Sequence, residues 1–182
     1  MKKLLFLDIE TTGFSADWNE IIEVAGIVME GDKEIDRFHE YIRPKKGIPA
    51  KITEITGIKM VDVSNADGEK EVLRRFVEWC YIQNPDALVG QNIKSFDLRF
   101  IKTKANKYNL PWKEFEIIDT LPMARSLIKQ DKIRTANAQQ KTLAEFFNIE
   151  YQAHSAIEDV RALIIIYKKM NKLIDKKPSL GF

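Results

Sequence analysis

The feature that most constrains this chain is an apolar run near its start that leads into two carboxylates. The run at residues 5–7 is followed by Asp8 and Glu10, and a Thr-Thr-Gly turn occupies residues 11–13. Side chains two residues apart lie on the same face of a strand, so Asp8 and Glu10 are expected to point the same way. Two carboxylates at the rim of a core repel each other unless a cation or a proton offsets their charge. The stretch therefore predicts a buried strand with a charge-compensating site at its end.

The composition limits the class of protein. A chain of 182 residues, 45% hydrophobic and 31% charged, is typical of one soluble globular domain with a sizeable core. The formal net charge of +2 is too small to indicate a nucleic-acid partner by itself. The single cysteine, Cys80, excludes an internal disulfide and fits a reducing compartment. No run approaches the roughly 20 apolar residues of a membrane helix. We therefore expect a cytoplasmic enzyme or binding domain with no membrane partner.

Hydrophobic periodicity predicts the order of the elements. Strands are expected over residues 3–9, 20–29 and 35–43, with a hairpin turn at 30–33, and His39 is expected on an exposed strand face. Shorter strands are expected at 87–90 and 115–118. They alternate with expected helices over 67–83, 95–108 with Ser95 as the N-cap, and 119–128 with Asp119 or Thr120 as the cap. Two more helices are expected over 142–147 and 156–174. This order predicts an α/β fold with a mixed sheet covered by helices, one domain over 1–174 and a short basic tail over 175–182.

Two further acidic residues occur at predicted helix starts. Asp97 follows a short strand and falls in the first turn of the next helix, where a capping role is a sufficient explanation for it alone. Asp159 falls in the first turn of the last helix, whose start is marked by a capping box of Ser155 and Glu158. His154 lies just outside that helix, and a surface or staple role is a sufficient explanation for it alone. These positions become informative only in combination.

The combination indicates metal-dependent phosphoryl chemistry. Asp8, Glu10, Asp97 and Asp159 all sit at a strand end or in a first helical turn, where α/β folds gather their sites. Four carboxylates offset the charge of two Mg²⁺ or Mn²⁺ ions, which prefer hard oxygen ligands. Such a pair of ions can clamp the attacking and leaving oxygens of a phosphodiester. His154, with a pKa near neutrality, can take the proton from an attacking water.

These motifs resemble the DEDDh 3′→5′ exonucleases of the ribonuclease H-like superfamily, and most of all the proofreading epsilon subunit and exonuclease domains of bacterial DNA polymerase III. The first motif is at residues 8–13, the second at 92–97, and the third is His154 with Asp159 five residues later. Ser155 stands where the tyrosine subclass has Tyr, so the histidine subclass is indicated. The resemblance covers about residues 3–172. It implies a ribonuclease H-like mixed five-stranded sheet, an antiparallel hairpin plus parallel strands, flanked by helices.

The resemblance also implies roles for the site residues. Asp8 would bridge two metal ions, Glu10 and Asp159 would help to hold the ion that activates water, and Asp97 would act on the second ion through water. The Thr11-Thr12-Gly13 turn would meet the 3′-terminal nucleotide.

Three further side chains are candidates for binding substrate. Phe14 and Phe96 would stack on the last bases, although core packing explains either aromatic equally well. Asn92 would hold the substrate backbone, although its amide can equally satisfy local backbone groups.

We therefore expect a metal-dependent 3′→5′ exonuclease that releases nucleoside 5′-monophosphates from single-stranded or frayed DNA. The alternatives are an exoribonuclease of the same family and a polymerase-associated binding module with little catalysis. A polymerase or a sliding clamp is the expected protein partner. The basic tail is a candidate docking peptide, although disorder is the default expectation for such a tail. The basic loop at 125–141 could steer a phosphate backbone, although a solvated loop explains it equally.

Overall fold

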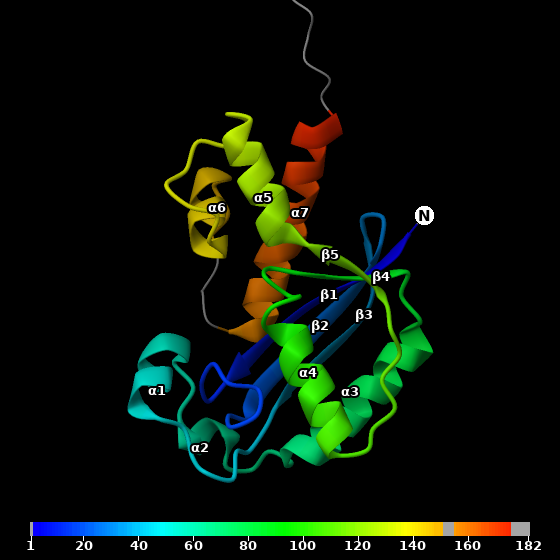
Figure 1. Ribbon diagram of the computed structural model, residues 1–182, viewed down its shortest axis with the longest axis vertical. Coiled ribbons are helices and arrows are strands. Elements are labelled where there is room, and N and C mark those ends of the chain that lie inside the picture. The colour runs from blue at the N-terminus through cyan, green and yellow to red at the C-terminus, as the bar shows by residue number, and fades with distance from the viewer. Residues whose placement is uncertain (1, 151–154, 176–182) are drawn as a thin grey trace, which may run out of the picture.

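The computed structural model describes residues 2–150 and 155–175. Its elements, in chain order, are β1 (Lys3–Thr11), β2 (Ile21–Glu30), β3 (Lys33–Tyr41), α1 (Ala50–Thr56), α2 (Met60–Val63), α3 (Glu69–Gln83), β4 (Ala87–Gly90), α4 (Asp97–Lys107), β5 (Glu116–Asp119), α5 (Thr120–Lys129), α6 (Gln140–Phe146) and α7 (Ala156–Asp175) (Figure 1). The predicted basic tail lies almost wholly outside the described residues. No helix in the described part of the chain is long and apolar enough to cross a membrane.

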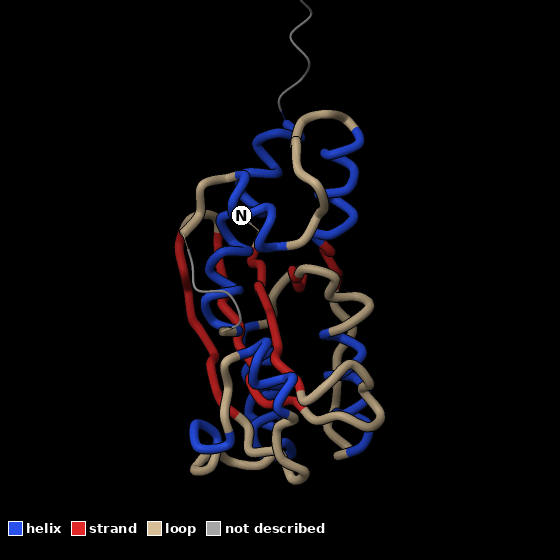
Figure 2. Tube along the Cα trace, turned by 90° about the vertical axis from the view of Figure 1, so that its left-hand side faces the viewer, coloured by secondary structure: helices blue, strands red, loops and turns tan. Residues whose placement is uncertain are grey.

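The five strands form one mixed sheet in the order β3-β2-β1-β4-β5. β2 pairs antiparallel with both β1 and β3, whereas β4 pairs parallel with both β1 and β5. The predicted fold class, a hairpin joined to parallel strands and flanked by helices, is confirmed. β1 is the central strand and is buried through most of its length, as its apolar run predicts. In Figure 2 the long strands run roughly along the long axis of the molecule.

Alternation along β1 sends its side chains to two different helical layers. Leu5 and Leu7 pack with Phe76 of α3 in one core cluster, which also takes in residues of α4. Phe6 packs on the opposite face with Val160 and with other residues of α7. α5 and α6 then pack on α7 in a further cluster and lie with it toward one end of the molecule (Figure 1). Asp8 has the parity of Phe6, so the carboxylates of β1 face the α7 side of the sheet.

Polar capping sets the start of α5 as predicted, whereas the start of α4 differs from the prediction. Asp119 caps α5, because its Oδ1 accepts a hydrogen bond of 3.0 Å from the backbone N–H of Leu121. The predicted N-cap at Ser95 is wrong: α4 begins at Asp97, and Phe96 occupies the cap position without a side-chain cap. The cause is Asn92, which takes the left-handed conformation (φ 60°) and starts a tight turn in which the N–H groups of Ser95 and Phe96 donate to its carbonyl.

Candidate active site

One cavity of about 210 Å³ collects the four predicted carboxylates. Asp8 and Glu10 come from the end of β1, Asp97 from the first residue of α4 and Asp159 from the first turn of α7. The other residues that line it are Ile9, Gln91, Asn92, Phe96 and Gln140. The two motifs that the sequence places at helix starts therefore do meet the carboxylates of β1, because α4 and α7 begin at the same end of the strand.

Asp8, Glu10 and Asp159 form the tightest part of the site. One carboxylate oxygen from each residue lies within 4.8 Å of the others, and all three side chains are half-buried. Oxygen ligands at this spacing suit a hard divalent cation. The donor set therefore fits the predicted metal.

Asp97 occupies a different position in the cavity. Only 2% of its surface is exposed, and its Oδ1 accepts a hydrogen bond of 3.2 Å from the backbone N–H of Ile9. This bond holds the start of α4 against β1 between the two carboxylates of that strand. Asp97 is not a member of the tight group of three.

Burial and mutual repulsion raise the pKa values of three of these carboxyl groups. Burial, together with the neighbouring charges of Asp159, Glu23 and Asp97, raises the pKa of Glu10 to about 8. Burial also raises the pKa of Asp97 to about 7. The pKa of Asp8 is raised well above its ordinary value by burial and by the charges of Asp97 and Glu10. A divalent cation would relieve this repulsion, so the electrostatics of the site favour cation binding.

A glutamine that sequence reasoning missed holds Asp159. Gln140, the first residue of α6, donates through Nε2 to Asp159 Oδ1 at 2.8 Å and to the Asp159 carbonyl at 3.0 Å. A Gln in a polar stretch gives no signal of this contact in the sequence. Together these bonds tie α6 to the first turn of α7 at the edge of the cavity.

The Thr-Thr-Gly turn is fixed by its own side chains. Thr11 Oγ1 donates to the carbonyl of Gly13 at 2.6 Å, and Thr12 Oγ1 accepts from the N–H of Glu20 at 2.9 Å. Gly13 packs so closely on Asn19 that an added Cβ would lie 2.7 Å from the side-chain amide. The turn therefore presents its backbone in one conformation beside Glu10.

The aromatic candidates differ in their packing. Phe14 is 76% exposed, with its ring centroid 6.4 Å from that of Phe96. Phe96 is half-buried, lines the cavity and packs on Phe100 with ring centroids 5.1 Å apart. Phe14 is thus available for stacking, whereas Phe96 also belongs to the core. Asn92 lines the cavity, and its backbone N–H donates to Asp119 Oδ1 at 3.0 Å.

The sequence contains two histidines, His39 and His154. His154, the predicted base, lies outside the described residues. His39 stands on an exposed strand face, as predicted, but its Nε2 lies 2.6 Å from the buried carboxylate of Glu23. Sequence reasoning assigned no role to either member of this pair.

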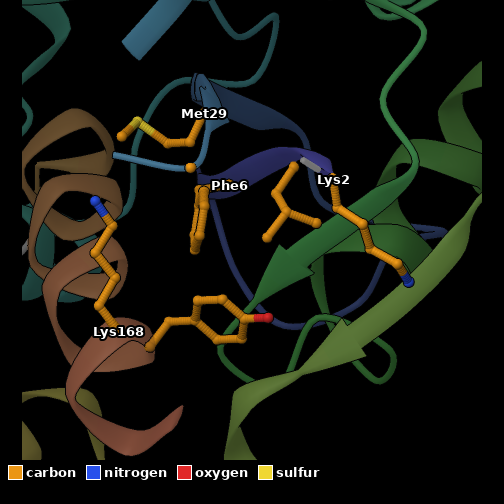
Figure 3. Close-up of a pocket in the computed structure, with 7 residues that line it drawn as sticks. Lys2, Phe6, Met29 and Lys168 are labelled. Carbon is orange, nitrogen blue, oxygen red and sulfur yellow. The ribbon is translucent and has the colours of Figure 1, made fainter. Parts of the chain in front are cut away.

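A second cavity, of about 310 Å³, lies at the opposite end of β1 (Figure 3). Phe6 and Met29 form apolar parts of its wall, and Lys2 and Lys168 are its charged residues. Since none of the residues lining it is acidic, this larger cavity lacks the ligands for a divalent cation. The smaller, polar cavity, which collects the four carboxylates, is the candidate active site.

Comparison with known proteins gives the same assignment. The RNase T family model, described as an exonuclease, matches residues 5–167. DNA polymerase III of the PolC type from Caldanaerobacter subterraneus subsp. tengcongensis is 37% identical over 180 residues, 98% of this chain and 12% of that protein. The PolC-type enzyme of Listeria monocytogenes is 38% identical over 176 residues, 96% of this chain and 12% of that protein. The chain thus spans about an eighth of the length of these relatives.

Solved structures share the fold at lower identity. A crystal structure of E. coli exonuclease I has a TM-score of 0.82 at 19% identity, covering 96% of this chain and 43% of that one. Cell-death related nuclease 4 has a TM-score of 0.79 at 20% identity, covering 95% of this chain and 64% of that one. The family match over most of the chain shows that this protein belongs to the RNase T family of exonucleases and, as its motifs predict, is of the DEDD type.

Proposed function

We propose that this protein removes nucleoside 5′-monophosphates from the 3′ end of single-stranded or frayed DNA in a reaction that needs two Mg²⁺ or Mn²⁺ ions. The observation that carries the proposal is the convergence of Asp8, Glu10 and Asp159 within 4.8 Å in a cavity that Asp97 also lines. DNA is favoured over RNA because the relatives are DNA polymerases and because exonuclease I was crystallised with dT13 and dA16 oligonucleotides.

The residues of the cavity have different proposed roles, according to their positions. Asp8, Glu10 and Asp159 would hold one ion, with Asp8 and Asp97 directed to the second. When bound, the ions supply Lewis-acid activation of water and stabilisation of the leaving 3′-oxyanion. Gln140 keeps the Asp159 carboxylate in place through its 2.8 Å hydrogen bond, and the Ile9 N–H does the same for Asp97 at 3.2 Å. His154 is the proposed base that accepts the proton of the attacking water, on the strength of the sequence motif.

The substrate strand is proposed to leave the cavity past the aromatic pair. Phe14, 76% exposed, would stack on a base near the 3′ end, and Phe96 would support the terminal base from the cavity wall. The turn at residues 11–13 would contact the terminal nucleotide through its backbone, and Asn92 would contact the phosphate-sugar chain. A polymerase assembly or a sliding clamp in the cytoplasm is the proposed partner, because the relatives are DNA polymerases III of the PolC type.

The test is hydrolysis of a DNA 15-mer labelled at its 5′ end or at its 3′ end. We expect a 5′-labelled strand to shorten in single-nucleotide steps with Mg²⁺ or Mn²⁺ and to stay intact in EDTA, and a 3′-labelled strand to release labelled mononucleotide at once. Asp8→Asn should lower the rate by about 10³-fold or more, since several kcal/mol of charge stabilisation depend on the metal site. Glu114→Gln, which removes an exposed carboxylate paired with Lys102, is the matched control and should keep the wild-type rate.

Three results would contradict the proposal. Binding of the 15-mer without degradation would support the binding-module alternative. Faster degradation of the matched RNA 15-mer would support the exoribonuclease alternative. A near-wild-type rate for Asp8→Asn would show that the reaction does not take place in this cavity.

A further inference from the structure

Glu23 is a fifth carboxylate beside the four of the candidate active site. It lies on β2 directly across from Glu10 of β1, and its side chain is completely buried. It does not belong to the group of three carboxylates that could share a metal ion. A buried carboxylate next to other carboxylates is costly, because each charge opposes the others. Such a residue needs partners that offset its charge.

The partners of Glu23 come from two other elements. Its Oε1 lies 2.6 Å from His39 Nε2 of β3, and 31% of that histidine side chain is exposed. Its Oε2 accepts a hydrogen bond of 3.1 Å from the backbone N–H of Ala156, the first residue of α7. The first N–H groups of a helix have no partner within the helix, and a carboxylate there is stabilised by the helix dipole. Glu23 therefore satisfies a helix start that is buried against the sheet.

The position of α7 decides where Asp159 stands. Asp159 lies in the first turn of α7, and its backbone N–H donates to the Ser155 carbonyl at 2.8 Å. Since Ala156 is the residue that Glu23 holds, the contact fixes the first turn of α7 against β2. β2 is in turn paired with β1 from Lys3 to Thr11, the strand that carries the other two carboxylates of the metal group. Glu23 thus links the two halves of that group without entering it.

We propose that Glu23, held by His39, is a positioning residue for the exonuclease reaction: it fixes the first turn of α7 so that Asp159 stays within reach of Asp8 and Glu10. This inference rests on the proposed function, since it assumes that Asp159 is a metal ligand. His39 orients the carboxylate so that its other oxygen meets the Ala156 N–H. Mutation of a residue that helps to orient a metal ligand typically costs about 10–100-fold in metal affinity or activity.

The experiment compares Glu23→Ala, Glu23→Gln and His39→Ala with a matched control. Glu40→Ala is the control, because Glu40 neighbours His39 on β3 but pairs with Arg75 of α3, and Arg75 keeps Asp67 as a second partner. We expect Glu23→Ala to lower kcat by about 10–100-fold with KM for the oligonucleotide within about twofold, and to weaken Mn²⁺ binding, followed by electron paramagnetic resonance, by about tenfold. Glu23→Gln, whose amide oxygen still accepts from Ala156, should stay within about threefold of wild type, and Glu40→Ala should be unchanged.

Hydrogen exchange separates local positioning from loss of the fold. In Glu23→Ala the amides of residues 156–161 should exchange faster, while those of α3 keep their wild-type protection. A folded Glu23→Ala protein with wild-type kcat and wild-type Mn²⁺ affinity would overturn the inference, as would a variant changed only in KM. If Glu23→Ala does not fold, the kcat values of Glu23→Gln and His39→Ala decide instead. Equal kcat values for these two variants would exclude positioning by the carboxylate. If the wild type binds Mn²⁺ but releases no nucleotide, the proposed function fails, while the Mn²⁺ and exchange data still decide the role of Glu23.

Discussion

Gln140 Nε2 donates a hydrogen bond of 2.8 Å to Asp159 Oδ1, so a side chain of α6 sets the orientation of a carboxylate on α7. A second bond from the same nitrogen, to the Asp159 carbonyl at 3.0 Å, fixes the backbone of that turn as well. The position of this carboxylate therefore depends on α6 as well as on its own helix.

Gln140→Ala should lower kcat by about tenfold or more while the protein stays folded, because the Asp159 carboxylate loses the donor that orients it. Single-turnover hydrolysis of a DNA 15-mer at saturating Mg²⁺ measures the effect. Gln139→Ala is the control, since Gln139 is exposed and makes no side-chain cap for α6. Equal rates for the two variants would show that Asp159 needs no orientation from α6.

The metal-free protein should lose stability as the pH rises from about 4.5 to about 8. Burial, together with the Asp159 charge, raises the pKa of Glu10 from its ordinary 4.5 to about 8, so the folded protein keeps a proton that the unfolded chain releases. Since the folded state binds more protons in this interval, the free energy of unfolding falls with rising pH. Asp8 and Asp97, whose pKa values are also raised by burial, act in the same direction.

Urea unfolding in EDTA at pH 5, 6, 7 and 8 measures this slope. Addition of Mn²⁺ at pH 8 should restore stability, because a ligand that binds only the folded state stabilises it. Glu10→Gln should flatten the slope in EDTA. A free energy of unfolding that rises steadily over the same interval, in wild type and in Glu10→Gln alike, would contradict the prediction. It would show that these carboxyl groups do not have raised pKa values in the folded protein.

Phe14→Ala should raise KM for single-stranded DNA by about fivefold or more with little change in stability, because Phe14 is 76% exposed and base–aromatic stacking is worth about 1–3 kcal/mol. Steady-state kinetics on oligo-dT, together with a thermal melt, gives both quantities. Tyr81→Ala, at a residue of α3 that is 43% exposed, controls for loss of a surface aromatic. An unchanged KM in Phe14→Ala would leave Phe14 without a substrate role.

Gly13→Ala should destabilise the protein by about 1–3 kcal/mol, because the added Cβ would lie 2.7 Å from the Asn19 amide. That amide cannot move freely, since its Oδ1 accepts from the Ser15 N–H at 3.0 Å. Chemical unfolding measures the change. Gly68→Ala, where nothing lies within 4 Å of the added atom, should cost less, and a reversal of this order would show that the turn relaxes around Asn19.

The sequence predicts the fold well where side chains follow a simple period. Alternation along β1 identifies the strand, and it places Asp8 and Glu10 on one face, where the structure has them close together. The mixed sheet follows from the order of hairpin and crossover elements, and the family assignment follows from the spacing of the motifs. The roles of the individual site residues stay predictions that the experiments above test.

Contacts that join distant segments were not predictable in this way. Glu23 reads as one more polar residue in an apolar strand, and only the fold reveals that it meets Ala156, 133 positions away. Gln140 gives no local signal because its partner lies on another helix. The wrong N-cap at Ser95 has a local origin: capping rules favour Ser, whereas the left-handed turn at Asn92 delays the helix to Asp97, whose carboxylate meets β1.

The wide separation of these segments has a consequence for synthesis of the chain. Ile9 meets Asp97 across 88 positions, and Glu23 meets Ala156 across 133. Contacts between such distant residues close late, because the intervening chain must first give up its loop entropy. On a ribosome β1 emerges before α4 and α7, so its two carboxylates meet Asp97 and Asp159 only after those later helices have been made. A nascent chain therefore carries no complete site for hydrolysis, and the ability to cut nucleic acid appears only when the fold closes.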